Sequence, residues 1–520
     1  MPTAAKAAVG ADLHNTNTTM TEAHSALKRA ARSSFTLGLS WPLLVALAAA
    51  LSVLGSTSIN VLADPDTYLH IAAGRWMLAH GSVPTADPFS HSMPGTSWVA
   101  HEWLSELVLS GIYQGFGWAG LGGLMALVFA GTLAYLMRFL LSRLEPVHAL
   151  LLTTYAACML AGHLLARPHV LAWPLLAVWV GALVHASEHD RAPPWWLIPL
   201  MAVWANLHGG FMLGIALACG LALDATVSQA PGQRRACAWL WARFIALAVV
   251  AAMVTPSDWR GLLFPFQMVN MSESLDMIGE WSSPNFHRPQ LLEIWLMLTL
   301  GLACSGRLRL PWVRMLMVLA LTHLALKYQR NVSILGLVAP FLVAAPLARQ
   351  WRASSRSGRD VQAMDRVFHA LTAPAQLRAL VGATMVVGLS MALAAQSDHF
   401  VPAANYTPEA AMQAARRAGV SGAVFNSYEY GGYLIFKGTP VFIDGRADLY
   451  GDAMMKRHLD ATTLAEPQAL PTLLNDYRIG WTLLHPGTPA LFSLDRMPGW
   501  RRVYADDVAV VHMREREGPQ

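Results

Sequence analysis

The sequence predicts a mainly α-helical, polytopic membrane protein with about eleven transmembrane helices and a small α/β domain at its C-terminal end. Three observations lead to this fold class. Hydrophobic residues make up 54% of the 520 residues and charged residues only 13%, about half of the roughly 25% found in soluble domains. The mean hydropathy is +0.38, and apolar stretches recur up to residue 396 before a polar segment follows. This composition excludes an ordinary cytosolic enzyme, a disordered scaffold and a disulfide-framework secreted protein.

Eleven apolar stretches are candidate spans, because a helix needs roughly 20 apolar residues to cross the hydrocarbon core. The first is too long and begins too late in the chain to be a cleaved signal peptide. The stretches lie near 41–61, 119–137, 148–166, 170–187, 195–208, 211–228, 244–255, 291–305, 312–326, 333–348 and 379–396.

The distribution of Lys and Arg predicts an N-terminus inside the cell and a C-terminal domain outside it. With this orientation the cytoplasmic segments hold 19 Lys and Arg, and the outer loops before residue 331 hold six. The positive-inside rule predicts this sign. Residues 397–520 contain 12 Lys and Arg against 14 Asp and Glu. The net charge of +5 is therefore a topology signal, and no nucleic-acid partner is expected. In a Gram-negative cell the protein would lie in the inner membrane with a periplasmic C-terminal domain.

The chain divides into three predicted parts. Residues 1–35 are polar and read as a disordered cytoplasmic N-terminus, and residues 36–396 as the transmembrane domain. The latter includes a first external loop (62–118), a second long external loop (256–290) and an Arg/Ser-rich cytoplasmic linker (349–378). Residues 397–520 read as an extracytoplasmic α/β domain with a helix at 407–418, which opens with Thr and Pro as a helix start does. Its predicted strands are Ala423–Phe425, Tyr433–Phe436, Val441–Ile443, Trp481–Leu484 and Val508–His512.

The first external loop carries acidic residues directly after the first span. Asp64 and Asp66 lie two residues apart, and His70 follows one helical turn later. Carboxylates at this depth are costly unless they meet water, a cation or a partner. The three residues are candidate ligands of Mg²⁺ or Mn²⁺, or one Asp is a general base. Alternatively, Asp64-Pro65-Asp66 ends one helix and caps the next.

Further polar residues lie near the outer ends of predicted spans, and each has two interpretations. His101 and Glu102 are weaker functional candidates at the start of an amphipathic helix, Glu102–Gly115. Asn206 and His208 either face the outer cavity or pack helices together. Glu280 is a second acid or metal ligand, or else a solvated loop residue.

Two basic residues open the predicted span at 333–348 from outside. Lys327 and Arg330 are candidates for binding a phosphate, since the planar guanidinium in particular matches phosphate oxygens. The alternative is that both side chains snorkel toward lipid headgroups.

The C-terminal domain has a polar cluster of its own. Glu429 and Tyr430 follow the first predicted strand, and Asp444 and Arg446 follow another. Sites in α/β domains commonly form just past strand ends. The alternative for Asp444 and Arg446 is a local turn with an ion pair.

Together these features resemble the GT-C superfamily of membrane glycosyltransferases. Asp64-Pro65-Asp66 stands where that superfamily has its acidic motif after the first span. The segment Tyr428–Gly431 is similar to the Trp-Trp-Asp-Tyr-Gly segment of oligosaccharyltransferases, but Glu429 replaces the Asp and no Trp pair precedes it. Several short segments, among them Asp-Pro-Asp-Thr-Tyr-Leu-His, Asn-Leu-His-Gly-Gly-Phe and Glu-Trp-Ser-Ser-Pro, are similar to those of a bacterial branch of GT-C-like proteins. Within the superfamily, the chain also resembles dolichyl-phosphate-mannose transferases.

The resemblance implies a transferase that takes a sugar from a polyprenyl-phosphate-linked donor in the lipid bilayer to a glycan, lipid or protein acceptor on the outer face. Asp66 would deprotonate or position the acceptor, and Asp64, His70 and Glu280 would be supporting ligands. Arg330 would meet the donor phosphate. The alternatives are a non-catalytic assembly factor that handles lipid-linked sugars and a transporter.

Overall fold

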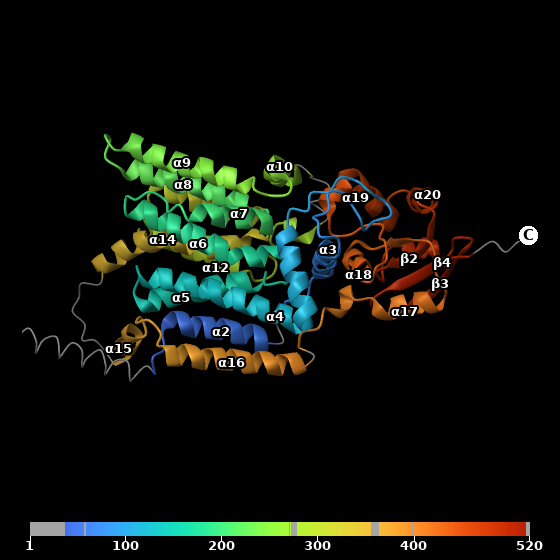
Figure 1. Ribbon diagram of the computed structural model, residues 1–520, viewed down its shortest axis with the longest axis horizontal. Helices are drawn as coiled ribbons and strands as arrows, with labels where there is room; N and C mark the ends of the chain where they lie inside the picture. Colours follow the sequence, from blue (N-terminus) through green and yellow to red (C-terminus); the bar gives the residue numbers. More distant parts are fainter. Residues whose placement is uncertain are drawn as a thin grey trace, which may run out of the picture.

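The computed structural model describes residues 37–56, 59–269, 271, 278–354, 363–397 and 399–515. Long helices run side by side along the long axis of the molecule, and the C-terminal domain sits at one end of them (Figure 1). The predictions for 1–35, for 355–362 of the cytoplasmic linker and for 272–277 of the second external loop lie outside the described residues.

A helix lies at each of the eleven predicted spans. These helices are α2 (Trp41–Gly55), α4 (Trp103–Leu141), α5 (Pro146–Ala161), α6 (Pro168–Glu188), α7 (Leu197–Leu207), α8 (Phe211–Ser228), α9 (Arg234–Ala252), α12 (Leu291–Cys304), α13 (Trp312–Lys327), α14 (Asn331–Ser354) and α16 (Leu377–Gln396). Short helices join some of them, among them α10 (Asp258–Val269), the 3₁₀ turn η1 (Gly279–Trp281) and α15 (Ala363–Ala370).

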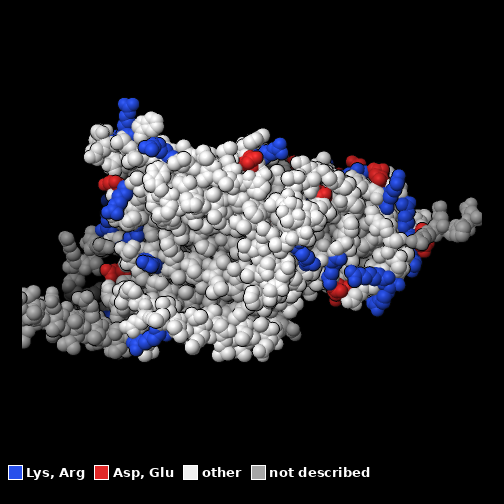
Figure 2. All heavy atoms as spheres, viewed as in Figure 1, with Lys and Arg blue, Asp and Glu red and all other residues white. Residues whose placement is uncertain are grey.

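The polytopic membrane character is confirmed. Within the described residues, six helices are long and apolar enough to cross a membrane, namely α4, α6, α8, α9, α14 and α16. On the face seen in Figure 2, charged side chains gather toward the two ends, and the middle of the bundle is almost uncharged. The full count of eleven spans and the inside position of the N-terminus stay predictions.

The first external loop begins with α3 (Asp66–His80) and continues into α4. The predicted amphipathic helix Glu102–Gly115 and the span at 119–137 are two parts of α4, which bends at Gly117, where φ is 61°. Gly74 lets α3 and α4 pack tightly, since a β-carbon there would lie 2.1 Å from the carbonyl oxygen of Glu106. This packing fixes α3 at the end of the bundle that bears the C-terminal domain.

The C-terminal domain is the predicted α/β fold. Its four-stranded sheet has the order β1-β2-β4-β3. The strand β1 (Ala423–Asn426) is parallel to β2 (Ile479–Leu484), whereas β4 (Val510–Arg514) is antiparallel to both β2 and β3 (Trp500–Ala505). The helices around the sheet are α17 (Glu409–Arg417), α18 (Gly431–Phe436), α19 (Ala447–Thr463), α20 (Ala469–Asp476) and α21 (Ala490–Leu494).

Two of the predicted strands are wrong. Tyr433–Phe436 belongs to the helix α18, whose apolar residues pack between α3 and the sheet. Val441–Ile443 lies outside the sheet and makes an isolated bridge between Val441 and Ser90 of the first external loop. The edge strand β3 was not predicted, because its side chains are mostly solvent-exposed and lack a clear apolar alternation.

The first external loop and the C-terminal domain share their hydrophobic cores. Ala73, Met77 and Trp98 of the loop pack in one cluster with residues of the C-terminal domain such as Phe442 and Leu470. In a second cluster, residues of α3 such as Tyr68 pack with α18. The loop thus holds the C-terminal domain on one end of the bundle.

Candidate functional site

Three carboxylates converge on one guanidinium at the junction of the bundle and the C-terminal domain. Nη1 of Arg167 lies 3.3 Å from Oδ2 of Asp64 and also contacts Oε1 of Glu280. Nη2 of Arg167 lies 2.5 Å from Oδ2 of Asp66. The side chains of Arg167 and Asp66 are 18% and 17% exposed. We call Asp64, Asp66, Glu280 and Arg167 the carboxylate cluster.

Local structure places each member. Oδ1 of Asp64 accepts a hydrogen bond from the backbone N–H of Asp66 at 2.8 Å and so starts α3. Asp66 is the first residue of α3, where the helix dipole favours a negative charge. Arg167 has extended backbone and directly precedes Pro168 at the start of α6. Asp64 thus bonds to the first N–H of α3, although Pro65 is the N-cap and α2 already ends at Gly55, and the other carboxylate oxygen of Asp64 reaches the cluster.

Burial shapes the charges of the cluster. It raises the pKa of Asp66 above the ordinary value, and the charge of Asp64 acts in the same direction, whereas Arg167 opposes both. Burial acts to lower the pKa of Arg167, but the negative charges of Asp64 and Asp66 outweigh this effect and raise the pKa above its ordinary value. Arg167 therefore keeps its charge, while Asp66 is a stronger base than a solvated Asp.

Arg330 adds a second cation beside the cluster. Its Nη1 lies 4.0 Å from Oε2 of Glu280, and its guanidinium lies 4.6 Å from the ring centre of Trp281. Burial, together with the charge of Arg167, lowers the pKa of Arg330 to about 10, so it stays protonated at neutral pH. The predicted partner Lys327 is exposed, and its ammonium lies 5.0 Å from the ring centre of Tyr328.

The predicted metal ligands do not fit a metal site in this arrangement. Asp64 and Asp66 both pair with Arg167, and Nδ1 of His70 lies 3.4 Å from Oε1 of Glu106 instead. The described part of the chain contains no group of three or more His, Cys, Asp and Glu side chains that could hold a metal ion. The guanidinium takes the place that the sequence suggested for Mg²⁺ or Mn²⁺.

A second polar group surrounds Glu102. Its Oε1 lies 3.7 Å from Nε2 of His101 and 3.6 Å from Nε2 of His208. Burial lowers the pKa of His208 to about 4, so its ring is neutral at pH 7. Burial would raise the pKa of Glu102, but His101 and other basic groups lower it. Glu102 is therefore the anion of this group.

Asn206 has the packing role among its two interpretations. Its Oδ1 accepts a hydrogen bond from Nε1 of Trp103 at 2.7 Å, and its Nδ2 donates to the carbonyl oxygens of Ala202 and Val254. All these bonds join α4, α7 and the end of α9. Asn206 therefore fixes helices and is not free to meet a substrate.

The C-terminal domain covers the carboxylate cluster through Tyr428 and Gly445. A β-carbon at Gly445 would lie 2.1 Å from Oδ1 of Asp66. Burial raises the pKa of Tyr428, and so do the charges of Asp66 and Asp444. Tyr428 therefore faces the cluster as a neutral phenol, at the carboxyl end of β1 where α/β sites form.

The predicted residues Glu429 and Tyr430 belong to a different group. Oε2 of Glu429 lies 3.6 Å from Nε2 of His485, and the hydroxyl of Tyr430 lies 2.7 Å from Nδ1 of the same ring. The Tyr430 hydroxyl also donates to the carbonyl oxygen of Val508. These contacts lie within the C-terminal domain. The sequence predicted Glu429 and Tyr430 as site residues, but it is the neighbouring Tyr428 that lies close to the carboxylate cluster.

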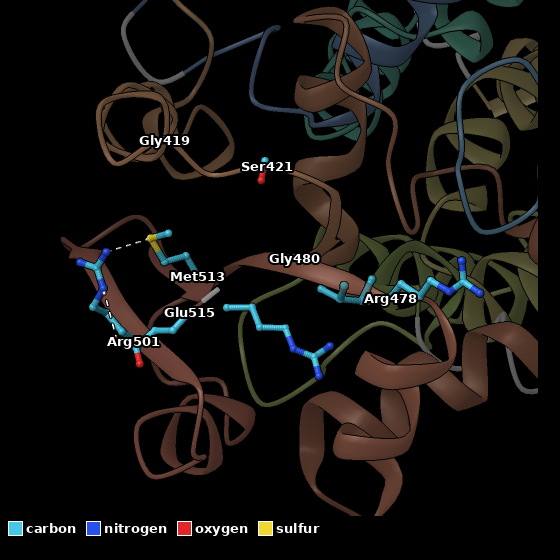
Figure 3. Close-up of a pocket in the computed structure, with 9 residues that line it drawn as sticks. Gly419, Ser421, Arg478, Gly480, Arg501, Met513 and Glu515 are labelled. Atoms are coloured by element: carbon cyan, nitrogen blue, oxygen red, sulfur yellow. Dashed lines mark hydrogen bonds and ion pairs between the residues drawn. The ribbon is translucent and has the colours of Figure 1, made fainter. Parts of the chain in front are cut away.

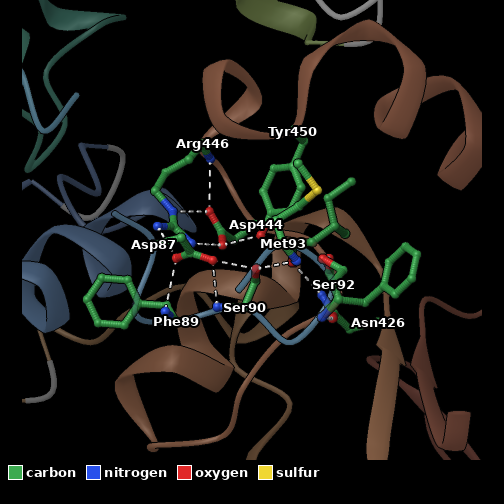
Figure 4. A network of polar contacts seen from close by, with 11 residues as sticks. Asp87, Phe89, Ser90, Ser92, Met93, Asn426, Asp444, Arg446 and Tyr450 are labelled. Carbon is green, nitrogen blue, oxygen red and sulfur yellow. Dashed lines mark hydrogen bonds and ion pairs between the residues drawn. The ribbon is translucent and has the colours of Figure 1, made fainter. Parts of the chain in front are cut away.

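Asp444 and Arg446 fasten the C-terminal domain to the first external loop (Figure 4). Nη2 of Arg446 lies 2.7 Å from Oδ2 of Asp444, and Nη1 lies 2.7 Å from Oδ1 of Asp87. The hydroxyl of Tyr450 donates to Asp444 at 2.6 Å. All three charged residues are buried. The ion-pair interpretation is therefore right, with a partner from the loop that was not predicted.

Two cavities lie in different parts of the C-terminal domain and its junction with the bundle. A cavity of about 640 Å³ lies at the start of β1 and β2, lined among others by Arg478, Arg501 and Arg514 (Figure 3). That edge of the sheet is opposite to the one that bears Tyr428. The other cavity, of about 370 Å³, lies between α10, the first external loop and Asp448. Only the second adjoins the polar groups described above.

Arg167 is the main site residue that the sequence did not single out, and Tyr428 was noted only as part of a segment similar to one in oligosaccharyltransferases. The sequence did contain a signal that points to Arg167. It is the one Lys or Arg in the short segment 167–169, which was predicted to be an outer loop. A charge in so short a loop at the membrane rim is expensive unless it has a partner.

Comparisons with known proteins find similar solved structures. Archaeal oligosaccharyltransferase AglB from Archaeoglobus fulgidus, solved with an inhibitory peptide and a dolichol-phosphate, matches at a TM-score of 0.49 and 11% identity, covering 85% of this chain and 69% of that chain. ArnT from Cupriavidus metallidurans matches in its apo state at 0.47 and bound to undecaprenyl phosphate at 0.43, each at 15% identity over 92% of this chain and 99% of that chain.

No model of a known protein family matches the chain, and no curated protein matches it. AglB and ArnT are both GT-C glycosyltransferases, but at TM-scores below 0.5 the likeness carries no argument about this chain.

Proposed function

We propose that the chain is a membrane glycosyltransferase that moves a sugar from a polyprenyl-phosphate-linked donor to an acceptor at the outer end of the helical bundle. The observation that carries the proposal is the convergence of Asp64, Asp66 and Glu280 on Arg167, with Arg330 alongside. In this proposal the outer end faces the periplasm and the bundle lies in the inner membrane.

Asp66 is the general base in this proposal. Its raised pKa makes it a better proton acceptor than a solvated carboxylate. It would take the proton of the acceptor hydroxyl as the acceptor oxygen forms its bond to C1 of the sugar. The bond between C1 and the phosphate oxygen breaks in the same step, and the polyprenyl phosphate leaves with the electron pair. Attack from the opposite face inverts the configuration at C1.

Arg330 and Arg167 stabilise the leaving phosphate. A guanidinium binds phosphate oxygens in a planar, bidentate way, and its charge is worth more in a partly buried site than in water. Arg330 is the better placed of the two, because Arg167 already has three carboxylate partners, whereas Arg330 has one weak contact with Glu280. The donor phosphate would thus replace part of the Glu280 interaction.

The test is a transfer assay with the full-length protein in nanodiscs. A panel of radiolabelled polyprenyl-phosphate sugars is offered to wild type and to Asp66→Asn, with extracted envelope glycans and lipids as acceptors. We expect label to leave the polyprenyl lipid in wild type and a loss of about 10²–10⁴-fold in the variant, the usual contribution of a general base.

The control is Asp258→Asn, which changes an acidic residue at the start of α10 that is not part of the cluster. It should transfer sugar like wild type. Equal turnover in wild type and Asp66→Asn would contradict the assignment of the base. Lipid-donor binding without turnover in any member of the panel would favour a non-catalytic assembly factor.

A further inference from the structure

The cavity of about 370 Å³ lies where three segments meet, and none of the residues that line it has a part in the proposed chemistry. Val99 comes from the first external loop, Trp259, Phe264 and Gln267 from α10, and Asp448 from the start of α19. Its volume falls within the roughly 300–1,000 Å³ of typical small-molecule sites. We call it the lateral cavity.

The lateral cavity combines an aromatic face with polar groups. The Trp259 side chain is 55% exposed, and the Arg260 guanidinium lies over its ring at 6.0 Å from the ring centre. Asp448, Gln267 and Arg260 offer a carboxylate, an amide and a guanidinium in the lining of the cavity. A pyranose has one apolar C–H face and a rim of hydroxyls that both donate and accept hydrogen bonds. An aromatic ring beside such side chains meets both needs.

Asp448 is the carboxylate of the lateral cavity. It is partly buried, and it has a hydrogen bond with its own backbone N–H. Burial raises its pKa, and His101 and Arg446 act in the opposite direction. A carboxylate has two oxygens with about four lone-pair sites, so Asp448 can accept further hydrogen bonds from the hydroxyls of a bound sugar.

His101 joins the lateral cavity to the proposed catalytic region. Its ring stacks on Phe264 with 4.1 Å between ring centres, and its Nε2 lies 3.7 Å from Glu102. The charge of Glu102 in turn interacts with His70 and Arg167, which also interact with Asp66. The lateral cavity therefore adjoins, through His101 and Phe264, the polar group around Glu102.

We propose that the lateral cavity is a carbohydrate-binding site that holds pyranose units of the acceptor, with Trp259 as the stacking face and Asp448 as the acceptor of sugar hydroxyl bonds. That the bound carbohydrate is the acceptor rests on the proposed function. That the cavity binds carbohydrate does not depend on it.

The experiment is saturation-transfer NMR on the full-length protein in nanodiscs that were assembled without sugar-headed detergent. The probes are methyl hexopyranosides and disaccharides of glucose, galactose and mannose, with linear sorbitol as a polyol that has no ring face. We expect ring-proton signals from at least one pyranoside and none from sorbitol. Trp259→Ala should weaken that binding about tenfold, since aromatic stacking contributes on this scale.

Three further variants separate a site from a general surface effect. Trp259→Phe should keep most of the binding, and Asp448→Asn should weaken it, because a carboxylate accepts stronger bonds than an amide. Trp196→Ala is the matched control, since Trp196 is 54% exposed at the start of α7, and it should leave the signals unchanged.

Two results would overturn the proposal. One is the absence of pyranoside signals above those of sorbitol. The other is binding that Trp259→Ala leaves unchanged, which would make Trp259 only a membrane-interface anchor. The outcome is separable from that of the transfer assay, because Asp66→Asn should bind the pyranosides like wild type. Pyranoside binding that Trp259→Ala weakens, together with an unchanged acceptor KM in that variant, would keep the site and contradict the assignment of its carbohydrate as the acceptor.

Discussion

A β-carbon added at Gly445 would lie 2.1 Å from Oδ1 of Asp66, so the C-terminal domain rests directly on this carboxylate. Gly432 makes a similar approach, since a β-carbon there would lie 2.7 Å from the carbonyl oxygen of Pro65. The C-terminal domain is therefore part of the site rather than a separate appendage. Its position decides how much room an acceptor has at Asp66.

The first prediction concerns this contact. Gly445→Ala should displace Asp66 or lift the C-terminal domain, and misplacement of about 1 Å costs roughly 100-fold in rate. We expect transfer to fall by about that factor while the thermal unfolding midpoint changes little. Gly111→Ala in α4 is the control, because a β-carbon there meets nothing within 4 Å. Full transfer activity in Gly445→Ala would show that the two parts do not need this close contact.

The second prediction concerns Arg167 as the cation of the cluster. Transfer by wild type should be insensitive to EDTA. Arg167→Gln should lose about 100-fold in transfer rate and gain Mn²⁺ binding, because three carboxylates then converge without a positive charge, and such oxygen ligands suit hard cations. Electron paramagnetic resonance of added Mn²⁺ measures this binding without any turnover.

The control for Arg167 is Arg288→Gln, which removes an exposed positive charge from the second external loop. It should bind no more Mn²⁺ than wild type. Tight Mn²⁺ binding to wild type, or transfer that EDTA abolishes and Mn²⁺ restores, would contradict the role given to Arg167.

Membrane spans were largely predictable, because a spanning helix follows from local hydropathy. The same holds for Asp64, Asp66 and Glu280, since acidic residues at a membrane rim need a partner wherever the chain folds. The partners of Arg167 and Tyr428 were not predictable in this way. They depend on contacts between distant segments, which neither spacing nor composition records.

The C-terminal domain shows the same limit. The four apolar residues Tyr433–Phe436 fit a strand as well as a helix, and packing against α3 decides for the helix. From the sequence, Asp444 and Arg446 fit a functional site as well as an ion pair. The ion pair between Arg446 and Asp87 decides for the structural role, but Asp87 lies 359 positions away from Arg446 in the chain.

The third prediction concerns that buried ion pair. Arg446→Ala leaves Asp444 and Asp87 buried without their cation, which should lower the free energy of unfolding of the C-terminal domain by about 3–5 kcal/mol. Denaturant titration monitored by tryptophan fluorescence measures the change. Lys456→Ala breaks an exposed pair with Asp460 and should cost less than about 1 kcal/mol. Equal effects of the two variants would contradict the structural role of Arg446.

The fourth prediction concerns the pH dependence of transfer. Only ionised Asp66 can take the proton from the hydroxyl of the acceptor, and burial raises the pKa of Asp66 above the ordinary 3.8. The value of kcat/KM should therefore fall as the pH drops through that raised pKa, at a higher pH than a solvated Asp would give. Asp64→Asn removes a neighbouring negative charge that contributes to the rise, so its acid limb should move to lower pH. Near-ultraviolet circular dichroism at each pH checks that the protein stays folded. An acid limb at the position expected for a solvated carboxyl, unchanged in Asp64→Asn, would mean that the titrating base is not Asp66.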